Sequence, residues 1–142
     1  MAFIIDKHSQ IKRIFPVIEL HNFIFRAPKK NLPELIGNNG LNCGVVVPVQ
    51  EKHRSIDDLD QLVDLSLQIN DSRYSTKQLW PIDGKPLGSL EWLRKNLSSY
   101  NKKLRDGNLI LAGTTLGLYN VRAGDQINVD LNGEKILSCL IQ

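Results

Sequence analysis

The sequence predicts a β-rich α+β domain in which a mixed sheet rolls into a barrel or sandwich and helices cover part of it. Residues 63–69 alternate apolar and polar side chains with a period of two, which is typical of a half-buried strand. Residues 127–131 alternate in the same way and lead into Asn132-Gly133, a two-residue turn that β-hairpins prefer. Residues 86–100 instead repeat leucines at helical spacing. Several strands with few helices indicate the α+β class.

The first third of the chain predicts a strand and a short helix. Phe15–Leu20 is a short apolar run, and Pro16 near its start suits the first position of a strand or a strand at a sheet edge. Asn31 is expected to cap a helix over residues 32–38, since Pro33 falls in the first turn, where a missing N–H costs nothing.

The middle of the chain predicts a buried strand, a helical turn and a hairpin. Residues 44–49 contain three consecutive valines, which favours a buried strand. Residues 55–62 open with a serine and two acids, the start of one or two helical turns. Asp71-Ser72 is expected to turn the chain, so that residues 73–80 return as the hairpin partner of residues 63–69.

The C-terminal third predicts the longest helix and three further strands. The helix over residues 86–100 is expected to bury an apolar stripe formed by Leu87, Leu90, Leu93 and Leu97 together with Trp92. Asp106-Gly107 then turns the chain into a short buried strand at 109–111. After the Asn132-Gly133 turn, residues 136–141 return as the last strand.

Length and composition indicate one soluble domain spanning residues 1–142. Hydrophobic residues make up 42% of the chain and charged residues 23%, as in ordinary globular proteins. The net charge is only +3, and the basic clusters are far apart in sequence and not interleaved with aromatics, so we expect no nucleic-acid partner. No run approaches the roughly 20 apolar residues of a membrane span. The first residues fail as a signal peptide, so we expect a cytoplasmic protein.

The residues that most often carry chemistry form no complete site. Cys43 and Cys139 are too few for a disulfide framework or a zinc site, and both lie in apolar runs, so we expect two reduced, buried thiols. His8 and His53 have no ligand partner at useful spacing and are expected at the surface. No serine or cysteine lies in a nucleophile motif such as Gly-x-Ser-x-Gly, so the catalytic residues remain unknown.

Short motifs in chain order resemble the C-terminal half of the 2-keto-4-pentenoate hydratases, which belong to the fumarylacetoacetate hydrolase superfamily. Pro16-Val17-Ile18-Glu19-Leu20-His21-Asn22 resembles the family's Pro-x-Ile-Glu-Leu-Pro-Asp, and Leu35-Ile36-Gly37-Asn38-Asn39 resembles its Leu-Ile-Ala-x-Asn. Three further segments resemble the end of the family sequence: 85–93 with Pro-Leu and Trp-Leu, 104–114 with its Leu-x-x-Gly pattern, and 121–127 with Gly-Asp-x-Ile. The resemblance implies a mixed rolled sheet with an inner barrel and flanking helices, truncated here at the N-terminus.

The resemblance also implies a metal site that this sequence does not complete. Family members hold Mg²⁺ or Mn²⁺ with a Glu-x-Glu pair and a later Asp, and the ion polarises the keto oxygen of a 2-oxo acid. No Glu-x-Glu lies before Pro16, and Asn22 stands where the family has the Asp. An amide lacks the charge of a carboxylate, so we expect the metal, and with it any cofactor, to be lost.

Two alternatives remain for the acid and the imidazole near Asn22. Glu19 and His21 lie two positions apart, which places them on one face of a strand, and with His53 or another acid they would bind a transition metal. The favoured alternative is that Glu19 makes a structural hydrogen bond.

Three positions retain binding chemistry by resemblance. Thr114 occupies the family's threonine near the place where the substrate carboxylate or carbonyl oxygen is held, Gly113 lets the backbone come close, and Asn39 matches an asparagine at the pocket edge. The alternative, which we favour, is that residues 113–117 form only a turn between strands.

Three functions follow as hypotheses. The first is a truncated hydratase-like domain that has lost catalysis and serves as a binding or assembly module, as a homo-oligomer or with a protein partner that covers its open strands. The second is a Mg²⁺- or Mn²⁺-dependent hydratase or decarboxylase acting on 2-oxo acids and completed by a partner chain. The third is a binder of a small 2-oxo acid that uses the pocket around Thr114 without catalysis.

Overall fold

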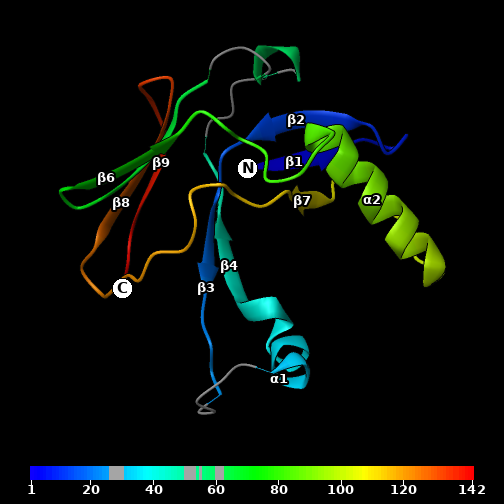
Figure 1. Ribbon diagram of the computed structural model, residues 1–142, viewed down its shortest axis with the longest axis horizontal. Coiled ribbons are helices and arrows are strands. Elements are labelled where there is room, and N and C mark those ends of the chain that lie inside the picture. Colours follow the sequence, from blue (N-terminus) through cyan, green and yellow to red (C-terminus); the bar gives the residue numbers. More distant parts are fainter. Residues whose placement is uncertain (26–30, 50–53, 55, 60–62) are drawn as a thin grey trace.

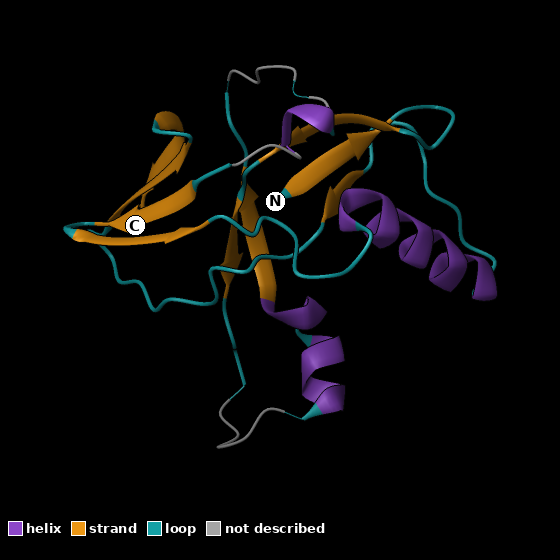
Figure 2. Cartoon of the chain, turned by 45° about the horizontal axis from the view of Figure 1, so that its top comes forward, coloured by secondary structure: helices purple, strands orange, loops and turns teal. Residues whose placement is uncertain are grey.

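The computed structural model describes residues 1–25, 31–49, 54, 56–59 and 63–142, and these residues form three antiparallel sheets with two α-helices (Figures 1 and 2). The strand orders are β2-β1-β7, β3-β4 and β6-β5-β8-β9. The observed class is therefore α+β and β-rich, as expected. The pairings among these residues are all antiparallel and close no barrel, which differs from the expected mixed sheet or barrel. The strands are β1 Ala2–Ile5, β2 Ile11–Phe15, β3 Ile18–His21, β4 Asn42–Val46, β5 Leu65–Ile69, β6 Ser72–Thr76, β7 Leu109–Leu111, β8 Gln126–Leu131 and β9 Glu134–Leu140.

The four-stranded sheet confirms the two hairpins that the sequence predicts. β8 and β9 are joined by the Asn132-Gly133 turn, and Leu131 pairs with Glu134. The Asn132 side chain also accepts a hydrogen bond from the Asp64 N–H at 2.8 Å, which ties this turn to the start of β5. β6 is shorter than expected, because it ends at Thr76. The alternation holds along β8, since Ile127, Val129 and Leu131 are all buried.

The three-stranded sheet has the beginning of the chain at its centre. β1 lies between β2 and β7, with Ala2 opposite both Phe15 and Leu111. Met1, Ala2 and Phe3 are buried accordingly. The expected single strand at Phe15–Leu20 is wrong: β2 ends at Phe15 and β3 begins at Ile18. Proline has no N–H for a sheet ladder, so Pro16 separates two strands that join different sheets.

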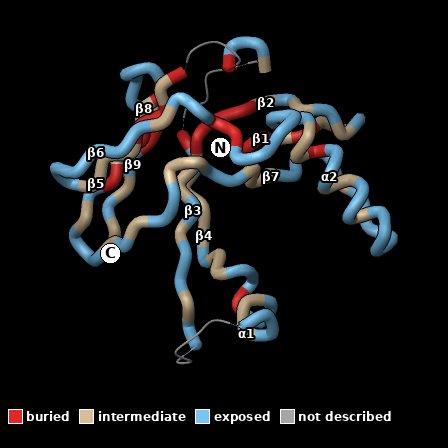
Figure 3. The backbone as a smooth tube through the Cα atoms, viewed as in Figure 1, coloured by how far each residue is buried: buried red, intermediate tan, exposed pale blue. Residues whose placement is uncertain are grey.

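The two-stranded sheet β3-β4 and helix α1, Leu32–Gly37, form an arm that extends away from the larger sheets (Figure 1). Asn31 caps α1 as expected, because its side chain accepts a hydrogen bond from the Glu34 N–H at 2.9 Å. The helix buries no residue, and Figure 3 shows its exposed surface. The expected buried strand 44–49 is wrong in extent and burial. β4 ends at Val46, and Val47 and Val49 are exposed, since β3 is the only strand that pairs with β4 among the described residues.

Helix α2, Lys85–Ser99, confirms the predicted long helix, but its buried face is narrower than expected. Leu90 is buried, whereas Leu87 is 52% exposed and Trp92 is 65% exposed. The prediction that Trp92 belongs to the core is therefore wrong. Only one face of α2 packs on the β2-β1-β7 sheet, and Trp92 lies two residues past Leu90, on a different side of the helix.

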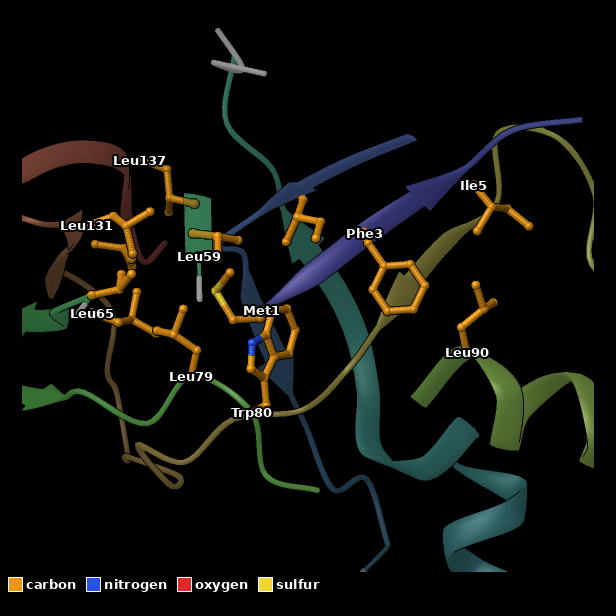
Figure 4. Close-up of a cluster of buried hydrophobic side chains, with 13 residues drawn as sticks. Met1, Phe3, Ile5, Leu59, Leu65, Leu79, Trp80, Leu90, Leu131 and Leu137 are labelled. Atoms are coloured by element: carbon orange, nitrogen blue, oxygen red, sulfur yellow. The ribbon is translucent and has the colours of Figure 1, made fainter. Parts of the chain in front are cut away.

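One cluster of buried hydrophobic side chains joins the two larger sheets and α2. In Figure 4, Leu90 of α2 points toward Phe3 and Ile5 of β1, while Leu65 and Leu131 approach from the four-stranded sheet. Nonpolar burial of this kind is the main favourable term in folding. The core thus fixes β1 and the four-stranded sheet relative to each other.

The remaining local predictions are confirmed in part. Within the expected helical segment 55–62, a short 3₁₀ helix covers Asp57–Leu59, while Ser55 and residues 60–62 lie outside the described residues.

Both cysteines are free, but Cys43 is exposed and Cys139 only half-buried, so the expectation of two buried thiols is wrong. In the part of the chain that the structure describes, no helix has the length and apolar character needed to span a bilayer.

Candidate functional site

A cavity of about 610 Å³ opens between β3, the four-stranded sheet and the loop between β7 and β8. Leu67 of β5 and Val129 of β8 contribute to an apolar wall. These residues occupy opposite positions on paired strands, since Leu67 pairs with Val129. The period-two alternation of both strands therefore places apolar side chains together on one face of the sheet. A volume of this size is within the range of small-molecule sites.

Two polar side chains of β3 line the same cavity. Glu19 and His21 point to one face, and Glu19 Oε1 lies 3.3 Å from His21 Nε2. The Asn42 side chain of β4 donates a hydrogen bond to the same Oε1 at 2.8 Å. The expected structural hydrogen bond of Glu19 is therefore confirmed. These contacts hold the carboxylate in place at the edge of the β3-β4 ribbon.

The loop after β7 contributes Gly113 and Thr114 to the lining of the same cavity. Gly113 has a φ of 83°, a conformation that favours glycine. Thr114 Oγ1 accepts a hydrogen bond from the Leu116 N–H at 3.0 Å, so the expected turn is present. The hydroxyl proton of Thr114 is not used in that bond, because the oxygen is the acceptor. The turn and a binding role are thus compatible at this position.

The amino group of Met1 is the unexpected polar group of the cavity. It donates a hydrogen bond to the Gly113 carbonyl at 3.0 Å, and Met1 lines the cavity. Burial lowers the pKa of this amine from 8.0 to about 6, because desolvation disfavours the charged form, while the charge of Glu19 acts in the opposite direction. No sequence pattern points to this group, since its position depends on β1 being the central strand of its sheet.

Asn22 and Asn39 do not line this cavity, although the sequence suggested both for a site. The Asn22 backbone is used locally: its N–H donates to the Leu41 carbonyl at 2.9 Å, and its carbonyl accepts from the Asn38 side chain at 2.6 Å. Asn39 is exposed and has a φ of 51° at the start of the short 3₁₀ helix Asn39–Leu41 that follows α1. The family's substrate asparagine and metal carboxylate therefore have no matching donor here at these two positions.

The donor set does not fit the divalent ion that the resemblance implies. Glu19 and His21 supply two neighbouring donors, and no group of three His, Cys, Asp or Glu side chains suited to a metal ion occurs in the described ranges. His53 lies outside the described residues, and His8 is exposed. Mg²⁺ prefers oxygen ligands, and Glu19 is the one carboxylate that lines the cavity in the described part of the chain.

What the site offers chemically is a largely apolar chamber with several polar groups in its lining. Glu19, His21, Thr114 and the Met1 amine provide both donors and acceptors. Such a combination orients a small ligand by its polar end while its apolar part is desolvated. Comparison of the sequence with protein-family models and with curated proteins gives no match.

Proposed function

We propose that this chain is a small-molecule-binding domain related to the 2-keto-4-pentenoate hydratases, with the fold of the fumarylacetoacetate hydrolase superfamily, that has lost metal-dependent catalysis. The cavity carries the proposal. Two segments of the family resemblance, residues 16–22 and 104–114, contribute Glu19 and Thr114 to the same chamber. The missing third metal donor among the described residues supports binding without metal chemistry.

The ligand class that suits the chamber is a short 2-oxo acid with an apolar tail. The tail contacts the Leu67 and Val129 wall, and the polar end receives hydrogen bonds from Thr114 and the Met1 amine. The negative charge of Glu19 repels an anionic ligand, whereas the protonated Met1 amine attracts it. An anionic ligand therefore gains affinity when the amine carries its proton. Because the pKa of that amine is about 6, the affinity for the anion rises as the pH falls from 8 to 6.

Calorimetric titration and thermal unfolding with 2-oxopentanoate test this function. A ligand at 100 times its dissociation constant adds about 2.7 kcal/mol to the free energy of unfolding. Thr114→Val removes the hydroxyl donor and is expected to weaken binding about tenfold, since a hydrogen bond to a charged group contributes about 1.5 kcal/mol. Ser138→Ala, an exposed hydroxyl of β9, is the matched control. No heat and no thermal shift at millimolar 2-oxopentanoate would reject this function.

The arm favours an assembly role for the same domain, with a second copy or another protein as the partner. Ile24, Leu32 and Ile36 are 68%, 69% and 71% exposed, so the arm presents apolar surface that α1 does not bury. A six-residue helix and a two-stranded ribbon gain little stability on their own. Light scattering of the purified chain tests this role, and Ile36→Lys is expected to shift any oligomer toward the monomer. A monomer at all concentrations, with no partner, contradicts it.

The alternative function is a Mg²⁺- or Mn²⁺-dependent lyase of 2-oxo acids completed by a partner chain. It is favoured by one observation, the Glu19–His21 pair facing the cavity. Electron paramagnetic resonance with Mn²⁺ distinguishes the two functions. Micromolar binding that Glu19→Gln abolishes supports the lyase, and free Mn²⁺ at all protein concentrations supports the metal-free binder.

A further inference from the structure

The positive charge of this protein is concentrated on one helix and the turn that follows it. Residues 85–105 contain six Lys or Arg and a single Glu, a net charge of +5. The whole chain carries only +3, so all other residues together carry −2. A local excess of this kind creates a positive potential that attracts anionic partners.

The solvent-facing side of α2 places a tryptophan among these charges. Pro86 and Leu90 are the buried residues of the helix. Lys85, Trp92, Lys95 and Ser99 follow at intervals of seven, three and four residues, so they share one face, here called the Trp92 face. Trp92 is 65% exposed on it.

The cations of this region differ in burial and in the contacts that they make with the rest of the fold. Arg94 donates a hydrogen bond to the Ser9 carbonyl in the turn between β1 and β2, so its role is structural. Lys95, Lys102, Lys103 and Arg105 are exposed. Tyr100, the C-cap of α2, is 69% exposed and adds a second aromatic ring close in sequence to Lys102, Lys103 and Arg105.

We propose that the Trp92 face and the turn 100–105 bind single-stranded nucleic acid. The lysines and Arg105 neutralise phosphates, and Trp92 stacks on a base, the combination used by proteins that bind single strands without sequence preference. A membrane surface is less well matched, because Asn96 and Ser99 beside Trp92 are polar. The exposed Leu87 lies about 140° away around the helix and cannot insert together with Trp92.

This proposal departs from the expectation, based on the sequence alone, that the protein has no nucleic-acid partner. That expectation depended on basic clusters that are separated along the chain and lack neighbouring aromatics. On the folded helix, Trp92 lies one turn from Lys95 and two turns from Lys85. Helical periodicity therefore places Trp92 on the same face as Lys85 and Lys95, although these lysines lie seven and three positions away in the sequence.

Fluorescence anisotropy with a labelled 12-nucleotide oligodeoxythymidylate tests the proposal. The logarithm of the association constant is expected to fall linearly with the logarithm of the salt concentration. Each phosphate contact to a single strand contributes about −0.7 to the slope, so four exposed cations predict a slope of about −3. The triple variant Lys95→Gln/Lys102→Gln/Lys103→Gln is expected to reduce that slope by about 2 and to weaken binding more than tenfold at low salt. The matched control, Lys7→Gln/Lys77→Gln/Lys135→Gln, removes the same charge from exposed positions outside α2 and is expected to change affinity less than threefold.

Trp92 itself provides the second measurement. The oligonucleotide is expected to quench the fluorescence of Trp92, while the buried Trp80 contributes little to the change. Trp92→Ala is expected to weaken binding about fivefold or more, and Trp92→Phe to retain most of the affinity. Circular dichroism confirms folding of each variant, since these side chains are exposed.

Four results overturn the proposal. One is no binding of the oligonucleotide at low salt, and another is an equal loss in both triple variants. The third is an unchanged affinity in Trp92→Ala. The fourth is equal or tighter binding of poly-glutamate or of phosphatidylserine vesicles, which assigns the surface to an acidic protein or to a membrane.

Discussion

Truncating Leu90 is the most direct test of how α2 is attached to the sheet. Its side chain is 1% exposed and belongs to the same cluster as Phe3 and Ile5 of β1. Replacement of a buried leucine by alanine removes apolar burial and leaves a cavity, at a cost of about 3 kcal/mol. The entropy of unfolding of a chain of this length is about 0.3 kcal/mol/K, so Leu90→Ala is expected to lower Tm by about 10 °C.

Leu87→Ala is the matched control on the same helix. Leu87 is 52% exposed, so its truncation is expected to cost less than about 1 kcal/mol and to lower Tm by at most about 3 °C. Differential scanning calorimetry and urea unfolding of both variants measure the difference. An equal or larger loss for Leu87→Ala would show that α2 packs through a different face, and the reasoning about Trp92 would fail with it.

Three other predictions concern charge and backbone conformation. The pKa of the Met1 amine is about 6 in the folded protein and 8.0 in the unfolded chain, so between these values folding releases a proton. The free energy of unfolding therefore rises by about 2 kcal/mol from pH 6 to pH 8. Urea unfolding is expected to show this rise, and the N-acetylated chain is expected to lack it. A hydrogen bond from the Asn70 side chain lowers the pKa of Asp125, so Asn70→Ala is expected to raise that pKa in an NMR titration. Because a carboxyl with a depressed folded pKa loses its stabilising contribution on acidification, the variant is expected to lose less stability as the pH falls. An unchanged titration contradicts the contact. Gly133 has a φ of 77° in the β8-β9 turn, so Gly133→Ala is expected to lower the free energy of unfolding in urea by about 1 kcal/mol. Gly44→Ala is the control, because Gly44 has an ordinary φ and open space around its Cβ position. The difference between the two variants isolates the effect of the left-handed conformation.

Local patterns in the sequence predicted the elements that depend on near neighbours. The Asn31 cap, the Asn132-Gly133 hairpin turn and the long helix all follow from residues within a few positions of each other. Burial was less predictable, because it depends on which element packs against which. The leucine stripe of α2 was expected to bury Leu87 and Trp92, but one sheet covers only one face of the helix.

The candidate site was predictable in part for the same reason. Glu19 and His21 are two positions apart on one strand, so their shared face follows from strand geometry. Their meeting with Thr114, and the arrival of the Met1 amine at the same cavity, depend on sheet order. A period or motif does not encode that order.

The central position of β1 has a consequence for biosynthesis. The Met1 amine hydrogen-bonds the Gly113 carbonyl, 112 positions further along the chain, and Phe3 pairs with Ile110. At a synthesis rate of about 5–20 residues per second, about 5–20 s pass between the synthesis of β1 and that of β7, the strand that completes its sheet. During that interval β1 presents an unpaired edge to other nascent chains, so ribosome-associated chaperones are expected to matter more for the yield of this protein than for one whose first strand pairs only with near neighbours.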